Sequence, residues 1–119
     1  LFCAAQFGHV GLMRLVVEFG AEIHARNADE ATPLILASFH GNLDCIAELL
    51  RARADVNACD ADKYTSLMWA AFKGRREAAV YLIEHGADMS VKSKEGNSAL
   101  TYAAYSGCEE LVDFMLDRG

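Results

Sequence analysis

The chain has 119 residues, of which 53% are hydrophobic, and a formal net charge of −6. This length fits one ordinary domain with enough apolar side chains for a core. The acidic balance argues against a nucleic-acid or anionic-membrane partner, because contact with phosphates needs a basic face. No apolar run approaches the roughly 20 residues that cross a bilayer, and membrane insertion is not expected.

The sequence repeats itself every 33 residues along its whole length. The equivalent residues are Leu1, Leu34, Leu67 and Leu100, then Gly8, Gly41, Gly74 and Gly107, and also Ala4, Ala37, Ala70 and Ala103. A fixed period of this size predicts stacked units that shield one another's apolar sides. We expect a single domain (1–119) with a partial first unit, two full units and a truncated fourth, at 1–26, 27–59, 60–92 and 93–119.

Each unit predicts two helices. The first unit contributes a second helix near 11–19. First helices are expected at 33–39, 66–72 and 99–105, and second helices at 43–52, 76–85 and 109–118. In the second helices apolar pairs recur one turn apart, as in Cys45-Ile46 and Leu49-Leu50, which is the stripe of a helix buried on one side.

Short polar residues and glycines mark the ends of these helices. Thr32, Thr65 and Ser98 stand where N-cap side chains accept a backbone N–H. Pro33 follows Thr32 at the first helical position, where its missing N–H costs nothing. Glycines expected as C-terminal caps follow the second helices. They are Gly20, Gly86 and Gly119.

The four cysteines occupy four different positions of the repeat. Side chains in a stacked array meet equivalent or adjacent positions of the next unit. We therefore expect no disulfides between Cys3, Cys45, Cys59 and Cys108. Reduced thiols are typical of an intracellular protein, either cytoplasmic or nuclear.

Catalytic motifs are missing from the sequence. It has no phosphate-binding loop, nucleophile elbow, His-Glu-x-x-His or Cys-x-x-Cys. The four histidines lie in different units or at different repeat positions, and they do not converge as metal ligands should. They are His9, His24, His40 and His85. We expect no enzymatic activity, no cofactor and no metal.

The repeated residues resemble those of the ankyrin repeat family. The resemblance rests on Thr32-Pro33-Leu34, the paired small residues and the glycine of each first helix, the Leu49-Leu50 pair and Ala54-Asp55-Val56-Asn57-Ala58. It covers the whole chain and implies an all-α solenoid of about four helix-turn-helix units with short β-turn fingers. It also implies a concave face, formed by the finger tips and first helices, that binds a protein or peptide.

Some residues depart from the family pattern. Glu30 and Lys63 stand where the finger tip usually has glycine, as in Gly96, and Arg53 replaces a helix-capping glycine. Each replacement costs about 1 kcal/mol where the backbone needs a positive φ. We expect left-handed backbone at these three residues or locally reshaped turns.

Neither end of the sequence resembles the polar capping repeat that closes such an array. The chain begins with Leu1-Phe2-Cys3 without a preceding finger, and its last helix keeps a full apolar set. We interpret the chain as a fragment of a longer array. Uncapped ends leave end-to-end self-association open.

Aromatic residues gather at the expected concave face. Phe39, Phe72 and Tyr105 share one repeat position, Trp69 and Tyr102 lie one helical turn earlier, and Tyr64 is in a finger. Aromatics at helical spacing are normally core, but Leu67 and the small residues already fill the core positions. We expect partial exposure and a partner-binding surface. The expected contact residues are Phe39, His40, Tyr64, Trp69, Phe72, Lys73, Tyr102 and Tyr105.

A row of acidic residues runs beside the aromatic positions. Asp29, Asp62 and Glu95 share one finger position, which is ordinary solvated surface or a feature that favours a partner carrying Lys or Arg. The function predicted from the sequence is a non-catalytic protein–protein interaction scaffold. The alternative is an intramolecular regulatory or spacer segment of a larger multidomain protein.

Overall fold

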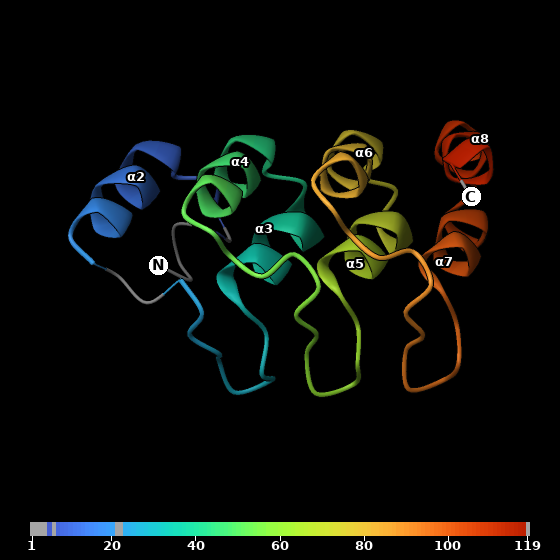
Figure 1. Cartoon of the computed structure of the whole chain (residues 1–119), viewed down its shortest axis with the longest axis horizontal. Coiled ribbons are helices and arrows are strands. Elements are labelled where there is room, and N and C mark those ends of the chain that lie inside the picture. The colour runs from blue at the N-terminus through green and yellow to red at the C-terminus, as the bar shows by residue number, and fades with distance from the viewer. Residues whose placement is uncertain (1–4, 6, 21–22, 119) are drawn as a thin grey trace.

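The computed structural model describes residues 5, 7–20 and 23–118, with the backbone alone at residue 16. In this part of the chain the helices form two rows (Figure 1). The first row is α3 (Pro33–His40), α5 (Ser66–Phe72) and α7 (Ala99–Ser106). The second row is α2 (Val10–Glu18), α4 (Leu43–Arg51), α6 (Arg76–Glu84) and α8 (Glu109–Arg118).

Three loops project from the side of the first row (Figure 1). They are named here the α3 finger (26–32), the α5 finger (59–65) and the α7 finger (92–98), after the helix that each precedes. The finger face is the surface that these loops form with α3, α5 and α7. The sequence prediction of an all-α solenoid is confirmed, and each described helix begins and ends within one residue of its predicted bounds.

Small and aliphatic side chains hold the rows together. In the first row Ala37, Ala70 and Ala103 are fully buried, and their size lets α3, α5 and α7 pack closely. Leu34 and Leu67 are each 1% exposed. Burying one such side chain contributes about 1.5–3 kcal/mol. The core therefore lies between neighbouring repeats and between the two rows.

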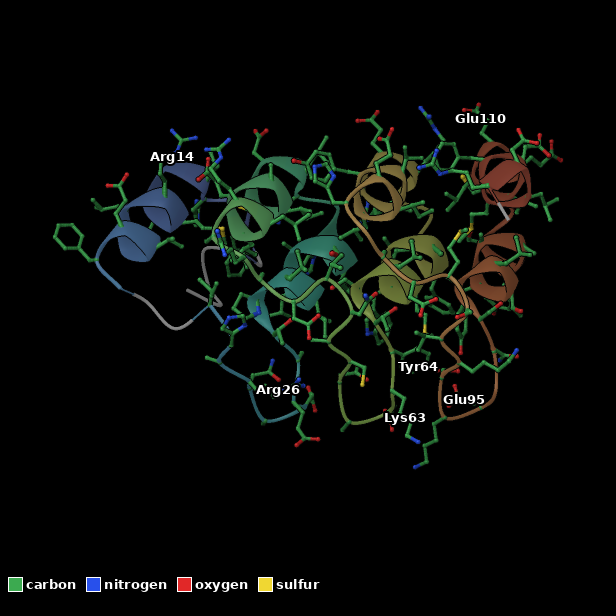
Figure 2. The ribbon with its side chains drawn as sticks, viewed as in Figure 1. Arg14, Arg26, Lys63, Tyr64, Glu95 and Glu110 are labelled. Carbon is green, nitrogen blue, oxygen red and sulfur yellow. The ribbon has the colours of Figure 1, made fainter. Side chains whose placement is uncertain are left out.

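A buried carboxylate links α2 to α4 in the second row. Glu48 is 8% exposed, and its Oε1 accepts from Arg14 at 3.0 Å and from Arg51 at 2.9 Å. Arg14 lies on α2 at the outer edge of the molecule (Figure 2). A buried charge is tolerated when it is paired, and these two guanidinium groups supply the pairing.

The fingers repeat one hydrogen-bond pattern. The Oδ1 atom of Asn27 accepts from the backbone N–H groups of Asp29 (2.9 Å) and Ala31 (3.0 Å). Asp60, one repeat later, accepts in the same way from Asp62 and Tyr64, each at 3.0 Å. These polar residues at the finger base fix the shape of the loop, because they satisfy backbone donors that no helix or sheet takes up.

Backbone hydrogen bonds also join one finger to the next. The Ala61 N–H donates to the Asp29 carbonyl at 3.1 Å, and the Lys94 N–H donates to the Asp62 carbonyl at 3.0 Å. The tips of the α3 and α5 fingers have left-handed backbone, with φ of 62° at Glu30 and 66° at Lys63. Arg53 has φ 72°, and the prediction of left-handed backbone at all three residues is confirmed.

The predicted caps hold at two of three first helices. Thr32 and Thr65 each accept a backbone N–H through their side chains, at 3.2 Å. Ser98 is the N-cap residue of α7, as predicted, but the expected capping hydrogen bond from a backbone N–H to its side chain is not formed. Its Oγ lies 3.5 Å from the hydroxyl of Thr101, a competing group at the position that Ile35 occupies in α3.

The predictions for the C-terminal glycines and for the cysteines can be compared with the structure only where these residues are described. Gly20 and Gly86 follow α2 and α6 with φ of 86° and 99°, as expected of C-terminal glycines, and Gly119 lies outside the described residues. Among the described residues, Cys45, Cys59 and Cys108 form no disulfide with one another, and Cys3 lies outside the described part.

Apolar side chains are exposed on the outermost helices. Phe19 is 82% exposed and Leu15 on α2 is 50% exposed, while Leu116 on α8 is 60% exposed. Leu100 is only half-buried, unlike its equivalents Leu34 and Leu67. No element among the described residues packs outside α2 or α8 (Figure 1). On α8 the apolar set is divided, because Leu116 is exposed whereas Leu111 and Met115 are buried.

We expect Ser66→Ala to raise the free energy of unfolding by about 1 kcal/mol, because Ser66 Oγ is buried and has no hydrogen-bond partner in the described part of the chain. Ser66→Pro should add roughly 0.4–1 kcal/mol more, since Pro33 occupies the equivalent first helical position of α3. Urea unfolding measures both changes.

The matched control is Thr65→Val. The neighbouring Thr65 hydroxyl caps α5, and its loss should cost about 0.5–2 kcal/mol. Destabilisation by Ser66→Ala as large as that by Thr65→Val would show that the Ser66 hydroxyl is satisfied in solution.

Candidate functional site

Aromatic side chains from three repeats meet on the finger face. The ring centroids of Phe39 and Trp69 are 5.1 Å apart, and those of Tyr64 and Trp69 are 4.9 Å apart. Phe72 lies 6.0 Å from Trp69 and stacks on Tyr105 at 5.5 Å. Distances of about 4.5–7 Å are typical of favourable aromatic pairs. With Tyr102, 5.5 Å from Tyr64, these side chains form a continuous set, named here the aromatic row.

The other two predicted contact residues, His40 and Lys73, lie on the same surface as the aromatic row. The His40 ring lies 4.9 Å from the Phe39 ring. The Lys73 ammonium lies 4.7 Å from the centroid of Phe39 and 5.7 Å from that of Phe72. Each distance is within the cation–π range of about 6 Å. The structure therefore brings together all eight residues that the sequence repeat selected.

Exposure differs along the aromatic row. Tyr105 is 77% exposed, whereas Trp69 and Phe72 are half-buried, which agrees with the partial exposure expected of these three. Tyr102 is only 7% exposed, and its inclusion among the contact residues is a wrong prediction. Its ring packs between Tyr64 and Phe72, and its hydroxyl lies 2.7 Å from Ser93 Oγ.

The indole of Trp69 is held in a fixed orientation by a carboxylate. Its Nε1–H donates to Asp60 Oδ2 at 2.9 Å, while the other oxygen of Asp60 binds the finger backbone. The sequence analysis did not select Asp60. The repeat did contain a signal, because Asp60 lies one repeat after Asn27 and one repeat before Ser93. The side chains at all three positions accept finger N–H groups.

A second polar contact joins the α5 and α7 fingers. Figure 2 shows Tyr64 on the α5 finger and Glu95 on the α7 finger beside it. The Tyr64 hydroxyl donates to Glu95 Oε1, and the Tyr102 hydroxyl donates to the same atom at 3.4 Å. The hydrogen bond to Glu95, followed by the one to Tyr102, raises the pKa of Tyr64 above its ordinary value.

The finger face is hollowed between the α3 and α5 fingers. This hollow, named here the α3–α5 pocket, has a volume of about 290 Å³. Its walls combine carboxylates of the fingers with apolar side chains of α3 and α5. The lining residues are Asn27, Asp29, Ala31, Ile35, Leu36, Phe39, Asp60, Ala61, Asp62 and Trp69.

The three carboxylates that share one finger position, Asp29, Asp62 and Glu95, differ in their hydrogen bonds. Glu95 accepts from two tyrosine hydroxyls. In the described part of the chain no hydrogen bond or ion pair reaches the carboxylates of Asp29 and Asp62. The nearby Arg26 side chain instead donates to the carbonyls of Glu30 and Cys59, at 2.8 and 2.6 Å. Two uncompensated negative charges therefore flank the α3–α5 pocket.

Other residues that the sequence singled out have structural roles. Asn57 accepts from the Asp88 N–H at 2.8 Å and donates to the Gly86 carbonyl at 3.3 Å, which stabilises the loop after α6. His85 donates through Nδ1 to the Tyr81 carbonyl at 2.8 Å, at the end of α6. Burial, followed by nearby carboxylates, raises the pKa of the Cys45 thiol and keeps it in the unreactive form.

The described residues contain neither a metal-binding cluster nor a helix suited to cross a membrane. No group of three or more His, Cys, Asp or Glu side chains there is placed to hold a metal ion. None of the described helices combines the length and apolar character needed to cross a membrane.

The chain belongs to the ankyrin repeat family. The family described as "Ankyrin repeats (3 copies)" matches residues 1–93 and 54–119, and the predicted count of about four repeats differs little from it. Repeats of this family generally mediate protein–protein interaction and are typically non-catalytic.

Two curated proteins are similar over 52 residues, or 44% of the chain. One is the E3 ubiquitin-protein ligase XB3 of Oryza sativa subsp. japonica, 38% identical, of which 12% is covered. The other is the inactive serine/threonine-protein kinase TEX14 of Mus musculus, 40% identical, of which 4% is covered. The chain thus matches a small part of two much longer proteins.

We expect Tyr64→Phe to lower stability by roughly 0.5 kcal/mol at neutral pH, because it removes a solvent-exposed hydrogen bond to Glu95. This deficit in unfolding free energy should shrink as the pH rises above 10.0, the ordinary pKa of tyrosine. There the unfolded wild type loses the Tyr64 proton while the folded form keeps it. The unfolded state then binds fewer protons, and wild-type stability falls with pH.

Urea unfolding of both proteins across this pH range measures the difference. Tyr105→Phe is the control, because its exposed hydroxyl has no hydrogen bond in the described part of the chain. A Tyr64→Phe deficit that stays constant through pH 10 and above would contradict the raised pKa.

Proposed function

We propose that this chain is a non-catalytic scaffold, built as one ankyrin-repeat domain inside the cell, that binds a partner protein or peptide across the concave face of the solenoid. The observation that carries the proposal is the aromatic row on the finger face. Phe39, Trp69 and Phe72 are half-buried, Tyr105 is 77% exposed, and Lys73 lies over two of the rings.

The chemistry of this surface fits protein recognition. Trp, Tyr and Arg are enriched among the residues that dominate binding energy, and truncating one costs about 2 kcal/mol or more. Aromatic rings have few rotatable bonds and lose little entropy on binding. Here Trp69 is already oriented by Asp60, and Tyr64 by Glu95. A surface ordered before the encounter loses less affinity to ordering.

The alternative is an intramolecular regulatory or spacer segment, in which the same surface contacts another part of its own polypeptide. The chain covers only 12% and 4% of the two similar proteins. A repeat array within so much longer a polypeptide has other parts of the same polypeptide to contact, and this supports the alternative. A pull-down with the isolated chain separates the two. Capture of a separate partner supports the scaffold, whereas binding only to other domains of the same polypeptide supports the regulatory segment.

We expect peptides selected by the chain from a phage-displayed random library to bind the finger face. The double variant Lys73→Glu/Tyr105→Ala should weaken binding of these peptides by about tenfold or more, which corresponds to roughly 1.4 kcal/mol. Both side chains are exposed, and the fold should persist. Fluorescence anisotropy with labelled peptides measures the affinity, and thermal melting confirms folding.

The matched control, Arg118→Glu/Phe19→Ala, changes one exposed cation and one exposed aromatic on the second row. Arg118 lies over the Phe114 ring, much as Lys73 lies over Phe39 and Phe72. Selected peptides should bind it as they bind the wild type. If the second-row variant loses binding and the finger-face variant keeps it, the proposed surface is on the wrong side of the solenoid.

A further inference from the structure

We propose that the α3–α5 pocket is a subsite for a single cationic side chain, lysine or arginine, of the bound partner segment. This inference rests on the proposed function and specifies the chemistry of the partner. It concerns the hollow between two fingers beside the aromatic row, lined by Asp29, Asp62, Phe39 and Trp69.

Charge is the first argument. Asp29 and Asp62 flank the pocket, and neither carboxylate has a hydrogen bond or ion pair in the described part of the chain. No lysine or arginine is among the lining residues. An ammonium or guanidinium group placed here would meet two uncompensated negative charges. The same charges would repel an acidic side chain, and they therefore favour a cationic partner.

The apolar part of the pocket suits the same occupant. Phe39 and Trp69 line it together with Ile35 and Leu36. Lysine and arginine have long aliphatic stems that pack on apolar surface while the charged group stays at the rim.

The size of the pocket limits what it holds. Its volume of about 290 Å³ is just below the roughly 300–1,000 Å³ typical of small-molecule sites. This space suits one side chain of a longer ligand better than a complete small molecule. The pocket would then anchor a peptide whose other residues lie along the aromatic row.

The pocket exists because one repeat has a small residue where the next has a large one. Ala31 of the α3 finger lines the pocket, and its equivalent one repeat later is Tyr64. Tyr64 packs on Tyr102 and donates to Glu95, which occupies the position equivalent to Asp62. The gap between the α5 and α7 fingers is therefore closed by a ring, and the Glu95 carboxylate there is already bonded. Of these two gaps, only the earlier one has a carboxylate without a hydrogen bond in the described part of the chain on both of its fingers, and this asymmetry would fix the register of the partner.

The chain contains a single tryptophan, and Trp69 therefore gives one indole N–H signal in a ¹⁵N-correlated NMR spectrum. This N–H donates to Asp60 inside the pocket lining and reports directly on occupancy. The probes are n-butylguanidinium and n-butylammonium chloride, with neutral n-butylurea as the shape-matched control. We expect a saturable shift of the indole signal with both cations and little shift with n-butylurea.

Three variants locate the binding. The double variant Asp29→Asn/Asp62→Asn should weaken the binding of both cations at least fivefold. Asp113→Asn/Asp117→Asn makes the same change in net charge on exposed positions of α8 and should leave their affinity unchanged. Ala31→Tyr should abolish the shift, because it fills the α3–α5 pocket as Tyr64 fills the next gap.

Equal shifts with n-butylurea, or equal weakening by the α8 variant, would overturn the subsite, because either result would show contact without recognition of charge at the pocket. Absence of a saturable shift with the cations would overturn it as well. None of these results touches the peptide measurements on Lys73 and Tyr105. The subsite can therefore fail while the proposed function stands, and the reverse outcome is equally visible.

Discussion

The structure depends on burial between repeats that are too small to fold alone. Helix α5 has only seven residues, and Leu67, Met68, Ala70 and Ala71 are all buried between its neighbours. Isolated helices of this length are marginal in water, and α5 is stabilised by α3 and α7 on its two sides. Close packing requires alanines at the contact, and large rings do not fit there. The aromatic side chains lie instead along the finger edge of the row, where they form the candidate binding surface.

The fingers convert this stack into a recognition surface. Asn27 and Asp60 use their side chains to satisfy finger backbone, and Asp60 additionally orients Trp69. Residues that hold the loop therefore also position the aromatic row. Differences between equivalent positions then give each gap its own chemistry. Ala31 leaves an open acidic pocket, whereas Tyr64 closes the next gap with a hydrogen bond to Glu95.

The repeat allowed much of the fold and of the candidate site to be predicted. Helix bounds follow from periodic residues such as Leu34 and Leu67, because the same local pattern occurs in each unit. The membership of the aromatic row followed from shared repeat positions for the same reason. The failures involve contacts between units. The burial of Tyr102 depends on rings from the α5 finger and α5, and the lost cap of Ser98 depends on the hydroxyl of Thr101. The α3–α5 pocket needs two fingers and two helices at once, and no single repeat encodes it.

The account claims that stability and binding are carried by different side chains of the same repeats. The most direct test compares the unfolding free energies of Leu67→Ala and Tyr105→Ala in urea. Leu67 is 1% exposed and Tyr105 is 77% exposed. The account predicts a loss of about 2–5 kcal/mol for Leu67→Ala and of less than about 1 kcal/mol for Tyr105→Ala. Equal losses for the two variants would contradict it, because the aromatic row would then belong to the core.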